Sequence, residues 1–398
     1  MTSLLGFLRR RSLSELPGVQ AARDVFSLPR PRKERMASIE TLRVIAILAV
    51  IGVHANPFAT FQGLGQKHRI AACLLSEAFR FAVPFFLITA GYFFGRSLQS
   101  GVKPSVLLTR YASPLLFIFM AWTFLYAVIP SHLPTAIRQH GVLRAFYGQA
   151  WESLIWLKDH PLEFLWEAKG PPGAWFGHLW FFPALIFALT TLALLLSLGV
   201  KEFIVPIAVM VAGFSFLEGL YDGTSLVFSS HFRTWGATLL YVVLGWWLAD
   251  KGRPSVVFAI ALALGGYVLQ VSEQVIFANL FETYPKLPNY MPIGSVAFTV
   301  GILLWALAKP NFGRATLLPV LAQFTLVVYV SHIFIIEALA PIREFLHSQV
   351  WEMSLPIVVY TLAVLLGAVL ARVPLANRLV LRKPRAPGGQ PSISRQES

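Results

Sequence analysis

The chain has 398 residues, of which 56% are hydrophobic and 13% charged, and its formal net charge is +14. This composition excludes an ordinary soluble domain, because such domains carry about 25% charged residues. Apolar runs of about twenty residues recur from end to end, which is typical of a polytopic helical membrane protein. The basic residues gather in the tails and short loops, which indicates membrane topology and argues against a nucleic-acid surface. The single cysteine, Cys73, excludes an intrachain disulfide.

Ten apolar segments predict an all-α fold, a polytopic membrane bundle of about ten transmembrane helices within residues 38–372. Basic loops alternate with acidic loops along the chain, and the positive-inside rule then places both termini in the cytoplasm. Residues 1–37 and 373–398 are expected to be basic cytoplasmic tails. The helices are expected near 38–57, 76–97, 111–130, 178–198, 203–220, 233–249, 255–273, 291–308, 317–338 and 355–372.

The longest connection between these helices, residues 131–177, is extracytoplasmic in this topology. It contains two amphipathic, tryptophan-rich stretches at 145–157 and 161–168. Such stretches are typical of helices that lie in the membrane interface, or of a lid, and not of a membrane span. We expect any substrate specificity to lie in this connection and in the outer loops.

The first expected helix carries three polar side chains in an apolar run: Glu40, Arg43 and His54. Arg43 and His54 are eleven residues apart, so they share one helix face and lie about 16 Å apart along it. Ionisable groups inside a membrane helix are energetically costly and indicate a functional site. The loop charges orient the helix with Arg43 toward the cytoplasm and His54 toward the outside.

His54 has the chemistry of a general base, because a neutral imidazole can take the proton of a hydroxyl nucleophile. The guanidinium of Arg43 suits phosphate or carboxylate. Structural roles remain open for both residues. His54 could form a hydrogen bond within the bundle, and Arg43 could reach the interface while paired with Glu40.

Other polar side chains in the apolar segments are candidates for substrate contacts. Arg80 either forms an ion pair with Glu77 or clamps a substrate. His178 could have a purely structural role at the N-terminal end of its expected helix. His332 lies far from either end of its expected helix, so its burial calls for a functional reason. No credible set of metal ligands is present, and the GxSxG, HExxH and GxxxxGK[ST] motifs are absent. The substrate candidates are Glu40, Arg80, Thr89, Tyr92, His178, Tyr329 and His332.

Four segments of the chain, in order, resemble the integral-membrane acyltransferase family 3. The first helix keeps the family's acidic–Leu-Arg element followed after ten residues by a histidine, here from Glu40 and Arg43 to His54. The other three similar segments are VPFFLITAGYFFGR in the second helix, HLWFFPAL at 178–185 and VVYVSHIFIIE late in the chain. Two departures are Ala90, where the family has serine, and Ser113, where some members have a second arginine after Arg110.

The resemblance implies a multi-pass enzyme of the bacterial inner membrane that transfers an acyl group, usually acetyl from acetyl-CoA. No permanently bound cofactor is implied, and the acceptor is a hydroxyl on a surface glycan, a lipid-linked sugar or a secondary metabolite. His54 is then the catalytic base and Arg43 its functional partner. Arg96 and Arg110 flank a short basic loop on the cytoplasmic side, where the phosphates of CoA would bind.

Two other classes of protein remain open from the residues themselves. A transporter or flippase for a glycan or lipid-linked intermediate would use Arg43 and His54 as a polar pathway, without consuming a thioester. A structural or sensory membrane subunit would use them as buried ion pairs, and it would tolerate lysine at position 43.

Overall fold

The computed structural model describes residues 36–58, 66–130, 133–167, 169–171, 177–220, 230–280, 292–346 and 348–373. The expected tails lie almost entirely outside these ranges. Within the described ranges every regular element is a helix and no strand occurs, which confirms the all-α fold class. The main helices are α3 (Ala37–Ala55), α4 (Gln66–Phe79), α5 (Ala82–Leu98), α6 (Pro104–Val128), α7 (Leu133–His140), α8 (Val142–Asp159), α9 (Pro161–Glu167), α10 (Phe181–Ser197), α11 (Ile204–Leu220), α12 (Ser230–Leu248), α13 (Val256–Leu280), α14 (Ile293–Ala308), α16 (Thr325–Ala338), α17 (Ala340–Leu346) and α18 (Gln349–Arg372).

The remaining elements are short: the 3-10 helices η3 (Gly177–Trp180), η4 (Lys201–Phe203) and η5 (Ala322–Phe324), and the single turn α15 (Leu318–Leu321). Each of the ten expected apolar segments coincides with a helix or with two or three consecutive elements. In the described part of the chain, seven segments are long and apolar enough to cross a membrane, and α14 and part of α12 form shorter apolar helices. The protein is therefore a helical membrane bundle, while the number of crossings and the side of each terminus stay predictions.

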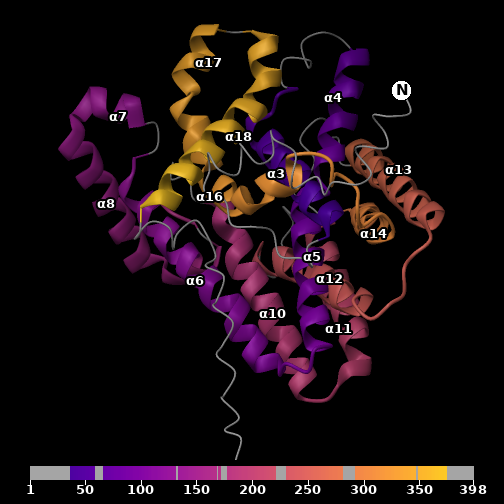
Figure 1. Cartoon of the computed structure of the whole chain (residues 1–398). Helices are drawn as coiled ribbons and strands as arrows, with labels where there is room; N and C mark the ends of the chain where they lie inside the picture. The colour runs from indigo at the N-terminus through magenta and orange to yellow at the C-terminus, as the bar shows by residue number, and fades with distance from the viewer. Residues whose placement is uncertain are drawn as a thin grey trace, which may run out of the picture.

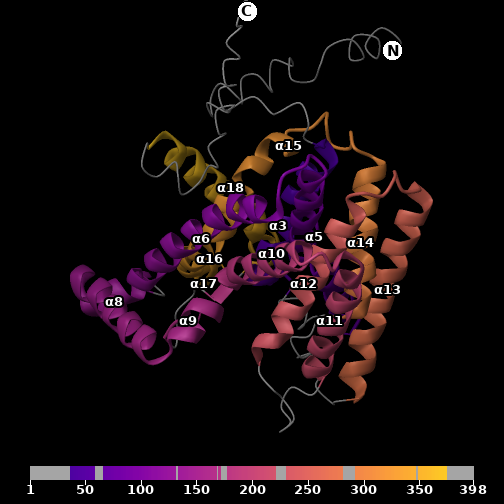
Figure 2. The ribbon, with the colours of Figure 1, turned by 90° about the horizontal axis from the view of Figure 1, so that it is seen from below.

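α3 is the central helix of the bundle and contacts α5, α14, α15, α16 and α18 (Figures 1 and 2). Apolar side chains are buried on several of its faces, including Ile39, Val44, Ile47 and Ile51. A helix that is apolar all round is buried in a protein or in a membrane. α3 ends at Ala55, because Asn56 adopts the left-handed conformation with φ 46° and its backbone N–H bonds to the carbonyl of Gly52 at 3.0 Å.

Two expected helices are interrupted in the structure. The second segment breaks between α4 and α5 at Arg80 and Phe81. Pro84 follows, and because proline has no N–H it leaves the carbonyl four residues earlier, that of Arg80, without its helical partner. The ninth segment is divided into α15, η5 and α16. The apolar pattern of the sequence continues through both interruptions.

The closest helix crossing joins α5 and α12 through two glycines. A Cβ atom added to Gly91 would lie 2.0 Å from the carbonyl oxygen of Val242, and one added to Gly245 would lie 2.0 Å from that of Ile88. Small residues let membrane helices approach to backbone contact. The two helices therefore pack in backbone contact at Gly91 and Gly245, and the crossing fixes α5 against α12.

Helices α7, α8 and α9 form an arm that extends to one side of the bundle, away from α13 and α14 (Figure 2). The two amphipathic stretches expected in the long connection are confirmed as the helices α8 and α9. α8 exposes an apolar stripe made of Leu143, Tyr147, Trp151 and Leu154. Such a stripe is typical of a helix lying in the membrane interface, and this placement stays a prediction.

Candidate active site

Three histidines from distant parts of the chain meet at the C-terminal end of α3. His54 comes from the last turn of α3, His178 from η3 and His332 from the middle of α16. The ring centroids of His54 and His332 are 5.1 Å apart, and those of His178 and His332 are also 5.1 Å apart. His332 is thus the central imidazole of this group, which we call the histidine cluster.

Two tyrosines hold the histidine cluster in place through backbone carbonyls. The hydroxyl of Tyr329 donates to the carbonyl of His178, and the hydroxyl of Tyr126 donates to the carbonyl of Val330 at 2.8 Å. The Tyr126 and His178 rings meet edge to face at a centroid distance of 5.3 Å. η3, α6 and α16 are therefore tied together around the three imidazoles.

The local structure explains why these side chains converge. Tyr329 and His332 are three residues apart on α16 and therefore lie on the same side of the helix. His178 lies in a 3-10 turn that leads directly into α10, so the start of that helix fixes its position. α9, whose Phe164 is buried, contacts η3 and closes the cluster on the side of the arm.

The three histidines differ in exposure. His332 is fully buried and His178 is buried with 7% exposure, whereas His54 is exposed. The end of α3 therefore presents one imidazole to the exterior, with two others behind it. An exposed imidazole supported by buried polar groups can exchange a proton with a bound substrate.

Arg43 and Glu40 lie near the opposite end of α3. A guanidinium nitrogen of Arg43 is 3.3 Å from a carboxylate oxygen of Glu40, and the Arg43 side chain is one-third exposed. Because α3 is unbroken from Ala37 to Ala55, Arg43 and His54 remain about 16 Å apart along it. Arg43 and His54 therefore lie on the same helix but belong to two separate sites, one near each end of it.

Arg80 belongs to a second polar group, between α4 and α13. Its Nε atom lies 2.8 Å from the buried carboxylate of Glu77. The amide of Gln270 donates to the same carboxylate at 3.0 Å and to the Glu77 carbonyl at 2.8 Å, and the Tyr267 hydroxyl donates to the carbonyl of Leu74. We call Glu77, Arg80, Tyr267 and Gln270 the Glu77 cluster.

The other predicted residues lie along α5 and at the start of α6, away from the histidines. The buried hydroxyl of Thr89 donates to the carbonyl of Phe85 at 2.7 Å, and Tyr92 is buried against Phe93. Arg96 is exposed and donates to the side chain of Gln99 at 2.9 Å. Arg110 is exposed on α6. Their roles in binding stay predictions.

No group of three histidine, cysteine, aspartate or glutamate side chains among the described residues could hold a metal ion. The histidine cluster is among these groups. Its His54 and His332 rings are tilted by 52° to each other, and its His178 and His332 rings by 80°. The arrangement supports proton transfer between imidazoles and substrate.

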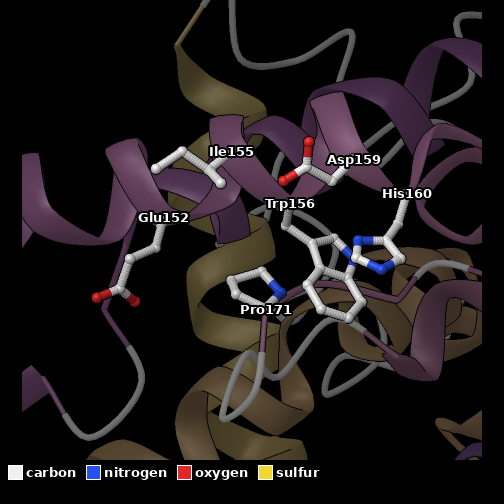
Figure 3. Close-up of a pocket in the computed structure, with 6 residues that line it drawn as sticks. All are labelled: Glu152, Ile155, Trp156, Asp159, His160 and Pro171. Atoms are coloured by element: carbon white, nitrogen blue, oxygen red, sulfur yellow. The ribbon is translucent and has the colours of Figure 1, made fainter.

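A cavity of about 240 Å³ lies on the arm, between α8 and Pro171 (Figure 3). The rings of Trp156 and His160 are stacked at 4.1 Å along one side of it. Glu152 and Asp159 also line this cavity (Figure 3). The cavity is separated from His178 by α9, which contacts both α8 and η3.

Sequence reasoning missed Tyr126 and Gln270. Each is a buried residue with a hydrogen-bonding group in an apolar helix. The sequence did place a polar atom of each residue within a membrane segment. Neither side chain is charged, however, so neither stands out in an apolar run as an ionisable residue does. Tyr126 in particular contacts the predicted residue His178.

A family model described as an acyltransferase domain matches residues 36–373. The matched region begins at the residue before α3 and ends just after α18, so it includes both ends of α3 and the whole histidine cluster. Comparisons with curated proteins and with solved structures gave no match. Because the family model covers far more than half of the chain, this multi-pass membrane protein belongs to the acyltransferase family 3 that its four segments resemble.

Proposed function

We propose that the protein is a membrane-bound O-acyltransferase that moves an acyl group, acetyl in the simplest case, from acyl-CoA to a carbohydrate hydroxyl. The acceptor is a cell-surface or lipid-linked sugar, and the enzyme acts in the bacterial inner membrane. The observation that carries the proposal is the exposed His54 imidazole, supported by His332 and His178 at the end of the central helix.

The proposed reaction needs one base and two aligned substrates. His54 takes the proton of the acceptor hydroxyl as its oxygen attacks the thioester carbonyl, so that a C–O bond forms. The C–S bond then breaks, and the proton passes from His54 to the departing CoA thiolate. Alignment of donor and acceptor supplies much of the acceleration, because a thioester is already an activated acyl group.

Arg43 is proposed to bind the donor at the other end of α3. A guanidinium pairs with phosphate through two parallel hydrogen bonds, and Glu40 at 3.3 Å holds its orientation. Arg96 and Arg110 contribute positive charge on the same, cytoplasmic side of the expected topology. The pantetheine arm of CoA would then extend along α3 toward His54.

The acceptor is proposed to approach from the side of the arm. His178 and Tyr329 lie on that side of His54, and the cavity formed by Trp156, His160 and Pro171 lies behind α9. An indole face flanked by carboxylates suits a hydroxyl-rich ring. This arrangement supports the expectation that the connection between α6 and α10 determines acceptor choice.

His54→Ala tests the enzyme assignment. We expect acyl transfer to fall by a factor of about 10² to 10⁴, the usual contribution of a general base. The measurement is mass spectrometry of surface glycans and lipids from cells that carry the wild-type or variant gene, with the amount of inserted protein determined in the same membranes. A stably inserted His54→Ala protein with full transfer would contradict the proposal.

A transporter or flippase is the alternative function. It would move a glycan or lipid-linked intermediate without breaking a thioester, so purified protein would release no CoA thiol from acetyl-CoA in the presence of acceptor. We expect thiol release that depends on acceptor and on His54. Arg43→Lys keeps the charge and loses the planar fork, and it should raise the KM for acetyl-CoA about tenfold or more.

A further inference from the structure

The buried histidine of the cluster has one protonation pattern that fits its surroundings. Nδ1 of His332 lies 2.6 Å from the backbone carbonyl oxygen of Tyr329. A carbonyl oxygen can only accept, so Nδ1 must carry the proton and donate it. In the neutral ring the lone pair is therefore on Nε2.

Nε2 of His332 is buried and has no hydrogen-bond partner among the described residues. His332 is 0% exposed, so water does not satisfy this atom from outside. A buried acceptor without a donor is unfavourable, and such atoms are rare unless they have a function. Nε2 of His332 is thus an acceptor held ready for an N–H or O–H group.

The groups that face His332 leave two candidate donors. They are His54 on α3, His178 in η3, Tyr126 on α6 and Tyr329 on α16 itself. Both tyrosine hydroxyls already donate to backbone carbonyls. The ring N–H groups of His54 and His178 remain, each with its ring centroid 5.1 Å from that of His332.

His54 is the better placed of these two donors. His178 is held by the hydroxyl of Tyr329 at its carbonyl and by the ring edge of Tyr126. The His54 residue is exposed, so its ring has room to turn toward Nε2. A hydrogen bond of about 3 Å between two ring nitrogens fits within the observed centroid distance.

We propose that His332 is the positioning residue for His54: its Nε2 accepts a hydrogen bond from a ring N–H of His54. This bond fixes the His54 tautomer and leaves the other ring nitrogen unprotonated and facing outward. The inference rests on the proposed function only in naming the acceptor hydroxyl as the group which that nitrogen meets. His332 itself touches no substrate and acts through His54, as the orienting carboxylate does in serine hydrolases.

Two substitutions at position 332 separate this role from simple packing. His332→Asn places its amide near the Nδ1 position, so it keeps the bond to the Tyr329 carbonyl and loses the acceptor at Nε2. His332→Gln reaches further and can restore an acceptor oxygen near the Nε2 position. Ser331→Ala is the matched control, because Ser331 is buried in the same turn of α16 and its hydroxyl bonds only within that helix in the contacts described.

The experiment uses full-length protein in lipid nanodiscs with histidine labelled in its ring by ¹⁵N. Nuclear magnetic resonance then reports the tautomer of His54, whose signals are assigned by their loss in His54→Ala. We expect one fixed tautomer in the wild type, in Ser331→Ala and in His332→Gln, and exchange between tautomers in His332→Asn. Unchanged His54 signals in a folded His332→Asn protein would overturn the proposal, and so would a change reproduced by His178→Phe.

Turnover gives a second readout with acetyl-CoA as the donor. We expect His332→Asn to lower kcat about tenfold to a hundredfold, with little change in the KM for acetyl-CoA. Losses of this size are typical when a residue that orients a metal-binding histidine is replaced, and the orienting role proposed here is similar. His332→Gln should recover part of the rate. The NMR result stands without any activity, so failure of the proposed function and failure of this inference remain distinguishable.

Discussion

The histidine cluster and the Glu77 cluster are two polar groups buried in one apolar bundle, and they are built in opposite ways. In the Glu77 cluster, a carboxylate meets a guanidinium at 2.8 Å and an amide at 3.0 Å. In the histidine cluster, the side chains are imidazoles, and Nε2 of His332 is left without a partner. Oε1 of Gln270 in the Glu77 cluster is likewise buried without a hydrogen-bond partner among the described residues. The clusters differ because the first contains an ion pair, whereas the second is made of imidazoles.

This difference separates a structural role from a chemical one. A buried ion pair holds helices in register, and breaking it leaves a charge that nothing else can compensate. Replacing an imidazole removes a group that can transfer a proton, and it leaves no carboxylate or guanidinium without its partner. Substitutions in the histidine cluster should therefore change rate, whereas those in the Glu77 cluster should change stability.

Among His178→Phe, Arg80→Gln and the two tyrosine variants below, His178→Phe is expected to have the largest effect, and that effect is on rate. The variant keeps the ring contact with Tyr126 and the backbone carbonyl that Tyr329 uses, but it removes both ring nitrogens. We expect kcat/KM for the acceptor to fall about tenfold to a hundredfold, or about 1.4–2.7 kcal/mol. Melting temperature in detergent should match the wild type, and a folded variant with unchanged kinetics would remove His178 from the site.

Arg80→Gln is expected to act on stability. It leaves the buried Glu77 carboxylate, 3% exposed, without its cation. Because Arg80 itself is partly exposed, we expect a loss of about 1–3 kcal/mol and not the full value of a buried pair. The measurement is thermal unfolding in detergent together with kcat and KM per folded molecule. A large rise in KM at unchanged melting temperature would instead assign Arg80 to substrate binding.

The smallest expected effects come from a matched pair, Tyr126→Phe and Tyr267→Phe. Each removes one hydroxyl that donates to a backbone carbonyl, at 2.8 Å to Val330 and at 2.7 Å to Leu74. Both should lower stability by about 1 kcal/mol. Tyr126→Phe should also lower the rate a few-fold, because it borders His178, and Tyr267→Phe should not. Equal kinetic effects would contradict the division between the two clusters.

Local features of this chain could be predicted from its sequence, because they depend on spacing along one helix. The apolar segments became helices, and the pairs Glu40–Arg43 and Glu77–Arg80 formed at three-residue spacing. The break before α16 was not predicted, since apolar periodicity continues through it. The meeting of His54, His178 and His332 was also beyond reach, because it depends on how α3, η3 and α16 pack in three dimensions.

The close approach of α5 and α12 at Gly91 and Gly245 affects how a mutational scan of this enzyme should be interpreted. Any side chain at either position drives α5 and α12 apart, so every substitution should score as loss of function. Gly213 and Gly265 have open space around their Cβ positions and should accept alanine. Intolerance at a helical glycine with such close neighbours therefore maps where two helices touch, whereas at Gly101, Gly141, Gly199 and Gly313 it would reflect a positive φ. Both causes must be accounted for before the remaining sensitive positions are assigned to chemistry.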